Sequence, residues 1–282
     1  MKKGCLIIIT VISGLIILSL LLTLVEKDVV QKEKIGIVTV EGPIITSKDT
    51  IEELKTYRKD NSIKAIILRV ESPGGGVAPS QEIYEEVKKT AKEKPVVVSM
   101  GAVAASGGYY ISAPATKIVA NPGTLTGSIG VIMEIPNIKG LMEKIGVKTE
   151  VIKSGRYKDI ASVFKDMEPE QRKILQSVLD DVHEQFIKAV AEGRKLPVNQ
   201  VRELADGRVF TGSQALQLKL VDELGNMEDA IELARELAGI KGEPQIVYKK
   251  EKISIIELLK NKLPKEILND YNTLKIKYLL TP

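Results

Sequence analysis

Short, largely apolar runs recur along this chain, and each is followed by a turn of small residues and then by a helical pattern. The clearest are Ile66–Val70, which leads into Ser72–Gly76, and Pro95–Ser99, which leads into Ala104–Gly108. Continuous apolar strands are typical of a parallel sheet that is buried on both faces, and parallel strands need crossover connections that are usually helices. The sequence therefore predicts an α/β fold with a mostly parallel sheet and flanking helices.

The remaining elements follow from the same patterns. Further strands are expected at residues 35–40, 117–120, 128–132 and 147–152, and amphipathic helices at 49–60, 79–93 and 168–193. From about residue 197 the pattern becomes mainly helical, and apolar positions within 253–259 predict a helix that docks on the domain. The expected organisation is an anchor (1–25), a linker (26–33), a main α/β domain (34–240) and a C-terminal helical extension (241–282).

The N-terminus predicts a membrane anchor. Residues 4–25 carry no charge, and as a helix they would reach about 33 Å, enough to cross the hydrocarbon core. A retained transmembrane helix is favoured over a cleaved signal peptide, because no Ala-x-Ala site follows the apolar run. Lys2 and Lys3 precede the run, so the positive-inside rule predicts a single-pass cell-membrane protein whose domain lies outside the cytoplasm.

Composition excludes several classes of function. The net charge is only +4, and no basic stripe with interleaved aromatic residues is present, so a nucleic-acid partner is not expected. The chain has one cysteine, Cys5, and one histidine, His183, which argues against an intramolecular disulfide and against a zinc site. We expect no metal and no cofactor.

Ser106 is the candidate nucleophile. It lies in Ala-Ala-Ser-Gly-Gly directly after a predicted buried strand, where a tight turn would expose a hydroxyl. A serine needs an adjacent base to become nucleophilic, and serine–lysine variants of the serine–histidine–aspartate triad exist. His183 lies beside the apolar stripe of a predicted helix among acidic residues, which is typical of a residue at the surface or at the edge of the stripe. Lys158 and Lys153 are the candidate bases, and the pattern alone does not separate them.

The glycine turns are candidates for stabilising a developing oxyanion. Glycines let backbone N–H groups converge on one point, and each such donor is worth about 2.7–4 kcal/mol in catalysis. We assign this role to Gly75 and Gly76 in the first turn and to Gly107 after the serine. A plain turn or a phosphate cradle would be the alternatives, but the chain lacks the GxxxxGK[ST] pattern of a nucleotide loop.

Four motifs in order resemble the signal peptide peptidase A family. They are Ser72-Pro-Gly-Gly-Gly, Ala-Ala-Ser-Gly-Gly-Tyr-Tyr at 104–110, Thr-Leu-Thr-Gly-Ser-Ile-Gly-Val at 124–131 and Ser-Gly-Arg-Tyr-Lys-Asp at 154–159. The resemblance covers about residues 35–240 and implies a Clp/crotonase-like fold. It implies that Ser106 is the nucleophile, Lys158 the general base and Ser128 the residue that orients the lysine amine. It also implies a homo-oligomeric ring in which the serine and the lysine come from neighbouring subunits.

Three functions follow for testing. The first is a membrane-anchored serine endopeptidase that cuts apolar peptides, such as cleaved signal peptides, through an acyl-enzyme. The second is a crotonase-type acyl-CoA enzyme, which would use the backbone amides without a serine–lysine pair. The third is a catalytically silent membrane scaffold. The role of residues 241–282 is open at this point.

Overall fold

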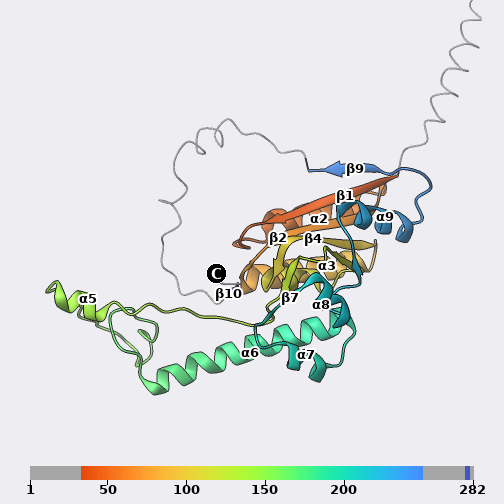
Figure 1. Cartoon of the computed structure of the whole chain (residues 1–282). Coiled ribbons are helices and arrows are strands. Elements are labelled where there is room, and N and C mark those ends of the chain that lie inside the picture. The colour runs from red at the N-terminus through yellow and green to blue at the C-terminus, as the bar shows by residue number, and fades with distance from the viewer. Residues whose placement is uncertain (1–32, 250–276, 280–282) are drawn as a thin grey trace, which may run out of the picture.

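The computed structural model describes residues 33–249 and 277–279 (Figure 1). The expected anchor (1–25) and the docking helix expected at 253–259 lie outside the described residues. Among the residues that are described, no helix is both long and apolar enough to cross a membrane.

A mostly parallel sheet forms the centre of the molecule. Its order is β7-β6-β4-β2-β1-β9, with β5 and then β8 attached beside the first half of β4. All neighbouring strands run parallel except β6 and β7, which are antiparallel. The strands are β1 (Lys34–Glu41), β2 (Ile63–Ser72), β4 (Val96–Ala105), β5 (Lys117–Ala120), β6 (Leu125–Gly127), β7 (Val209–Thr211), β8 (Glu223–Leu224) and β9 (Gln245–Tyr248). A separate two-stranded ladder joins β3 (Gly74–Gly76) to β10 (Lys277–Leu279).

Helices cover both faces of this sheet, as continuous apolar strands require. The helices of the described chain are α2 (Lys48–Lys59), α3 (Val77–Ala91), α4 (Gly107–Ser112), α5 (Lys139–Lys144), α6 (Pro169–Arg194), α7 (Val198–Leu204), α8 (Gly212–Gln217) and α9 (Met227–Leu237), of which α5 lies away from the sheet. On one face, Ala230 and Ala234 of α9 pack against alternate residues of β1, β2 and β4 such as Ile67. The other face carries the larger core, to which α2, α3, α4 and α6 contribute.

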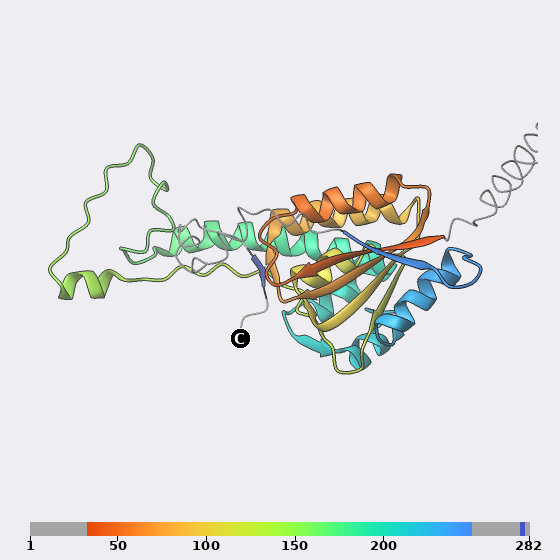
Figure 2. The same cartoon turned by 90° about the horizontal axis from the view of Figure 1, so that it is seen from above.

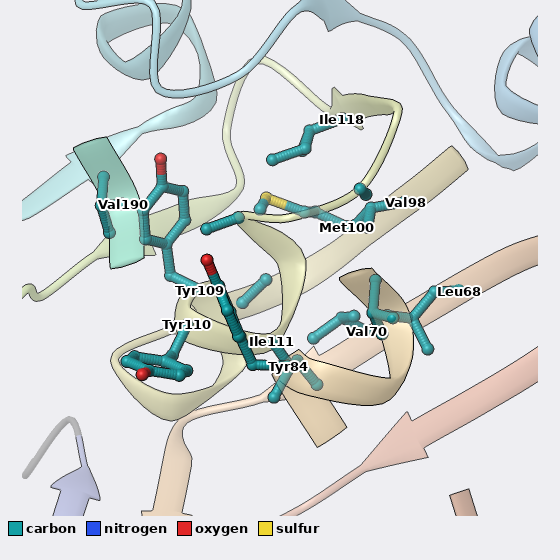
Figure 3. Packing of buried hydrophobic residues seen from close by; sticks show 14 of the residues in the cluster. Leu68, Val70, Tyr84, Val98, Met100, Tyr109, Tyr110, Ile111, Ile118 and Val190 are labelled. Carbon is teal, nitrogen blue, oxygen red and sulfur yellow. The ribbon is translucent and has the colours of Figure 1, made fainter. Parts of the chain in front are cut away.

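The larger core holds α4 rigidly in place. Tyr109 is fully buried, and its hydroxyl donates to the carbonyl of Leu220 at 2.8 Å. The next residue, Tyr110, packs against Tyr84 with ring centroids 5.0 Å apart (Figure 3) and against Phe186 with ring centroids 4.8 Å apart. The two tyrosines after the serine turn are therefore core residues that fix the first helix beyond it.

Residues 131–168, here called the arm, leave the sheet and run alongside the projecting first half of α6 (Figures 1 and 2). The arm is closed at its base by a backbone hydrogen bond from Ile138 to Val163 and by an ion pair between Lys139 and Asp166. Several of its apolar side chains are exposed, including Ile145 at 61% and Ile152 fully.

The structure confirms most of the predicted elements, and three expectations were wrong. Residues 147–152 are not a strand, because they lie in the arm, away from the edge of the sheet. The strand expected at 128–132 lies earlier, at β6, and Ser128 ends it with a φ of 49°. Residues 245–248, expected in a helical extension, form β9 and pair with β1 at the sheet edge.

Candidate active site

Ser106 occupies a sharp turn between β4 and α4. Its backbone has φ 52° and ψ −116°, a region that residues with a side chain rarely adopt. Two hydrogen bonds fix the turn: the N–H of Ser106 donates to the carbonyl of Gly127 at 2.8 Å, and its carbonyl accepts from the N–H of Tyr110 at 2.8 Å. Strained backbone of this kind clusters at active sites, where the surrounding structure holds it in place.

The glycines after Ser106 bring the serine turn against the glycine strand β3. A Cβ on Gly107 would lie 2.8 Å from the hydroxyl of Ser80 and 3.1 Å from the nitrogen of Gly75. A Cβ on Gly108 would lie 2.7 Å from the carbonyl oxygen of Ser72. Only glycine permits this approach, so the two motifs that are 30 residues apart in the sequence form one site.

The two edges of β3 differ in what they bond. On one edge, the N–H of Ile44 donates to the carbonyl of Gly74, and the N–H of Gly76 donates to the carbonyl of Ile44, both at 2.8 Å. Since backbone groups alternate in direction along a strand, the N–H and carbonyl of Gly75 face the opposite edge. The expectation for Gly76 as an oxyanion donor therefore needs correction, because its N–H already has an acceptor.

Two backbone N–H groups lie at the junction of the turns. One is the N–H of Gly75, and the other is the N–H of Gly107, which as the first residue of α4 has no acceptor within the helix. The hydroxyl of Ser72 helps to fix the glycine turn. It donates to the carbonyl of Gly42 at 2.7 Å and accepts from the N–H of Gly74 at 3.1 Å. Sequence reasoning missed the role of Ser72, and only its position just before the glycine turn could have indicated it.

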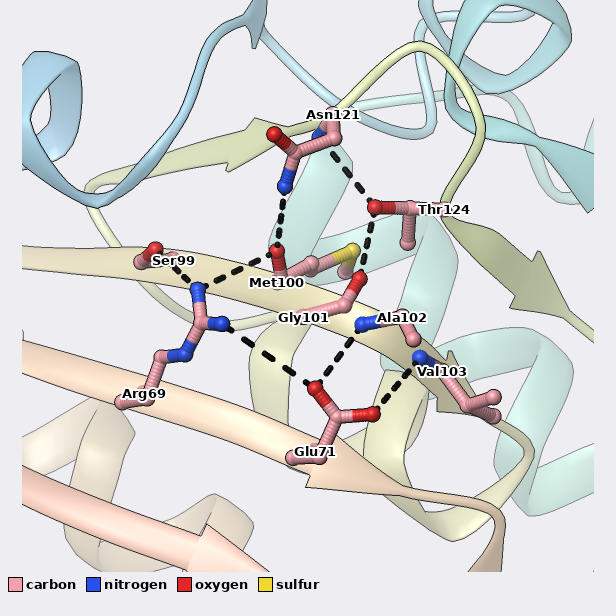
Figure 4. Close-up of polar contacts among 9 residues, drawn as sticks. All are labelled: Arg69, Glu71, Ser99, Met100, Gly101, Ala102, Val103, Asn121 and Thr124. Atoms are coloured by element: carbon pink, nitrogen blue, oxygen red, sulfur yellow. Dashed lines mark hydrogen bonds and ion pairs between the residues drawn. The ribbon is translucent and has the colours of Figure 1, made fainter.

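A carboxylate shapes β4 just before the nucleophile. The register of β2 against β4 shifts between Val70 and Ser72, and the extra β4 residues bulge out opposite Glu71. The carboxylate of Glu71 accepts the N–H of Ala102 at 2.8 Å and of Val103 at 3.2 Å (Figure 4). Three side chains also stabilise the bulge. Those of Arg69 and Asn121 donate hydrogen bonds to the carbonyl of Met100, and that of Thr124 donates to the carbonyl of Gly101. Glu71 was not singled out from the sequence.

Lys158 and Lys153 differ in their partners. Both lie in the arm, and within this chain the arm extends away from the sheet end that carries Ser106 (Figures 1 and 2). The Lys153 amine donates to the Asp159 carboxylate at 2.6 Å and to the carbonyl of Arg156 at 3.0 Å. In the described part of the chain, no carboxylate lies within ion-pair distance of the Lys158 amine. The two candidate bases thus differ in that the arm's own carboxylate binds Lys153.

The partners of Lys153 also change the acidity of Asp159. Hydrogen bonds from Lys153 and then Lys165 lower the pKa of the Asp159 carboxyl to about 2. Asp159, which follows Lys158 in the sequence, is thus bound by two other lysines, and this explains why it does not form an ion pair with Lys158.

Ser128 lies beside the serine turn and lines a pocket. It is nearly buried, it directly follows Gly127, whose carbonyl accepts from the N–H of Ser106, and its own N–H donates to Arg208. The pocket has a volume of about 490 Å³ and is walled by residues 130–133, by 205–207 and by α6. His183, expected at the surface or at the edge of the apolar stripe, is half-buried and lines this pocket.

Comparisons with known proteins agree with this geometry. The sequence model of Peptidase family S49 matches residues 88–241, and that of Clp protease matches residues 27–124. A Synechocystis protein named as a protease is 48% identical over 211 residues, which are 74% of this chain and 76% of the relative. The signal peptide peptidase SppA of Enterococcus faecium is 40% identical over 71% of this chain and 59% of its own. The chloroplastic serine protease SPPA of Arabidopsis thaliana is 36% identical over 73% of this chain and 30% of its own.

The matched region spans less than two thirds of the latter two relatives. The family model covers more than half of the sequence, and it includes Ser106, Ser128 and Lys158. This chain belongs to peptidase family S49, a family of serine proteases.

Proposed function

We propose that this protein is a membrane-anchored serine endopeptidase that hydrolyses apolar peptides such as cleaved signal peptides. The observation that carries the proposal is the strained Ser106 turn, which Gly107 packs directly against the glycine strand β3. This packing supports Ser106 as a nucleophile beside backbone N–H groups, which is the arrangement that acyl transfer needs. The name of the Enterococcus relative supports signal peptides as the substrate class.

The chemistry follows from the residues at the turn. The Oγ of Ser106 attacks the scissile carbonyl, and the amine of Lys158 accepts its proton. The N–H groups of Gly75 and Gly107 stabilise the oxyanion, and Lys158 then protonates the leaving amine. An acyl-enzyme on Ser106 remains, and water hydrolyses it after Lys158 takes one of its protons.

The arm supports a site shared between two copies of the chain. Lys158 lies on the arm, and the arm exposes apolar side chains that a single chain leaves uncovered, among them Leu141, Ile145 and Ile152. A second copy covering these side chains would supply its Ser106 turn to the lysine. We therefore propose a closed homo-oligomer in which each site takes the serine from one subunit and the lysine from the next.

The proposal of a membrane anchor rests only on the sequence of residues 4–25, which carry no charge. A single N-terminal span would hold the site close to apolar peptides left in the bilayer. The positive-inside rule places the peptidase domain outside the cytoplasm.

Mixing two inactive variants tests the shared site. Ser106→Ala and Lys158→Ala are each expected to abolish cleavage of a fluorogenic apolar peptide. Co-assembled at equal amounts, they should recover roughly a quarter of the parent activity, since that fraction of random interfaces pairs an intact serine with an intact lysine. Lys153→Ala is the matched control, because its lysine is held in an ion pair, and it should stay active.

Each alternative has a distinct outcome. Failure to recover activity in mixed oligomers, with assembly confirmed by mass, would refute the shared dyad. A parent that neither cleaves peptides nor reacts with a serine-directed fluorophosphonate would refute the peptidase and favour a scaffold or an acyl-CoA enzyme. The comparisons favour the peptidase over both.

A further inference from the structure

Lys158 lies at the centre of a short hydrogen-bonded segment of the arm, residues 155–162, here called the lysine turn. The N–H of Lys158 donates to the carbonyl of Gly155 at 3.2 Å, and two more backbone hydrogen bonds of the same spacing follow along the turn. Lys158 itself is exposed, and its amine has no hydrogen-bond or ion-pair partner among the described residues. The position of this amine therefore depends on the backbone of the turn and on the neighbouring side chains that hold it.

A single carboxylate holds the two side chains that precede Lys158. One oxygen of Glu170 accepts from the guanidinium of Arg156, and the other accepts from the hydroxyl of Tyr157, each at 2.5 Å. The Arg156 guanidinium also lies over the Tyr157 ring, 5.1 Å from its centroid. The hydrogen bond to Glu170 raises the pKa of the Tyr157 hydroxyl. Within the described chain, Glu170 is the only residue whose side chain hydrogen-bonds either of these two side chains.

Glu170 connects the lysine turn to the rigid part of the molecule. It lies in the first turn of α6, directly after Pro169, and this helix continues unbroken for 26 residues. The far half of α6 is anchored in the core by the buried side chains of Phe186, Ile187 and Val190. Figure 2 shows the arm beside the projecting half of this helix. The Glu170 carboxylate thus ties the turn that carries the lysine to a helix that the core holds in place.

The other charged contacts of the turn stay within the arm. Asp159 binds Lys153 and Lys165, which are both arm residues, so these ion pairs shape the turn without attaching it to α6. Loss of one of these lysines leaves the other in place. Glu170 has no such substitute, because among the described residues no other hydrogen bond or ion pair joins the lysine turn to α6.

We propose that Glu170 is a positioning residue of the peptidase, which holds the lysine turn so that the amine of Lys158 can reach Ser106. This inference rests on the serine peptidase and the lysine base proposed above. Displacing a reacting group by about 1 Å can lower a rate about a hundredfold. Because the Asp159 contacts persist, we expect Glu170→Ala to lower kcat about tenfold. KM should stay close to that of the parent, since Glu170 acts on the lysine turn and not on the peptide.

Steady-state kinetics of the full-length chain on a fluorogenic apolar peptide test this. Arg172→Ala is the matched control, because it removes an exposed charged side chain without a partner from the same end of α6, and it should retain the parent kcat. Arg156→Ala/Tyr157→Phe should show the same loss of kcat as Glu170→Ala, and adding Glu170→Ala to it should cause no further loss, because all three act through one contact.

A parent-like kcat in Glu170→Ala, or losses that multiply in the triple variant, would overturn the proposal. A parent without peptidase activity would instead refute the proposed function, and this inference with it.

Mixed oligomers separate positioning of the lysine from a general effect on folding or assembly. In such mixtures the Ser106→Ala chain supplies the lysine and the Lys158→Ala chain supplies the serine. Adding Glu170→Ala to the first chain should lower the recovered activity about tenfold, and adding it to the second should leave that activity unchanged. Equal losses in the two arrangements would show a merely structural role and overturn the proposal. If the mixtures recover no activity, the shared site is refuted, and the kcat of the single variants decides the role of Glu170.

Discussion

The strain at Ser106 can be measured as stability, separately from catalysis. Ser106→Ala and Ser106→Gly both remove the hydroxyl, and they differ only by one Cβ. At φ 52° and ψ −116° a side chain costs about 1–3 kcal/mol, which glycine avoids. Glycine in turn loses about 0.5–1 kcal/mol through the greater freedom of its unfolded chain. Ser106→Gly should therefore be more stable than Ser106→Ala by about 1 kcal/mol, or about 2–4 °C in melting temperature for a domain of this size.

Thermal unfolding of the two inactive proteins, followed by circular dichroism, measures this difference. Ser112 is the matched control, because it is also a buried serine of the same segment but lies in the helix α4. There glycine should be less stable than alanine, since only its entropic cost remains. The reasoning is refuted if Ser106→Gly melts at or below the temperature of Ser106→Ala while the Ser112 pair behaves as expected.

Three further outcomes are expected. Gly108→Ala should destabilise the protein by about 1–3 kcal/mol and abolish activity, because its Cβ would meet the Ser72 carbonyl at 2.7 Å; melting and peptidase assays check this. Tyr109→Phe should cost about 1–3 kcal/mol in urea unfolding, because it leaves a buried carbonyl without its donor, whereas an unchanged midpoint would contradict the bond. The pKa of Asp159, read by carbon NMR, should lie near 2 and rise in Lys153→Ala. Since this pKa is lowered in the folded state, the contribution to arm stability should be present above about pH 4 and lost as the pH falls toward 2.

Local pattern determined the central elements of this protein. Continuous apolar runs such as 96–98 have no polar face, so they are expected to be buried on both sides, and a parallel sheet under helices follows. The turn at Ser106 was also predictable, because small residues directly after a buried strand leave room for a sharp change of direction. These inferences need only the nearest neighbours in sequence.

Tertiary structure decided what each turn contacts. Sequence alone could not show that the N–H of Gly76, and not that of Gly75, donates to the carbonyl of Ile44, because that depends on which segment lies alongside β3. Nor could it show that Asp159 binds Lys153 rather than Lys158, because that ion pair is set by how the arm folds. The pairing of Tyr278 with Gly75 joins the C-terminal strand to a turn about 200 residues earlier, and no local pattern carries the register of so distant a contact.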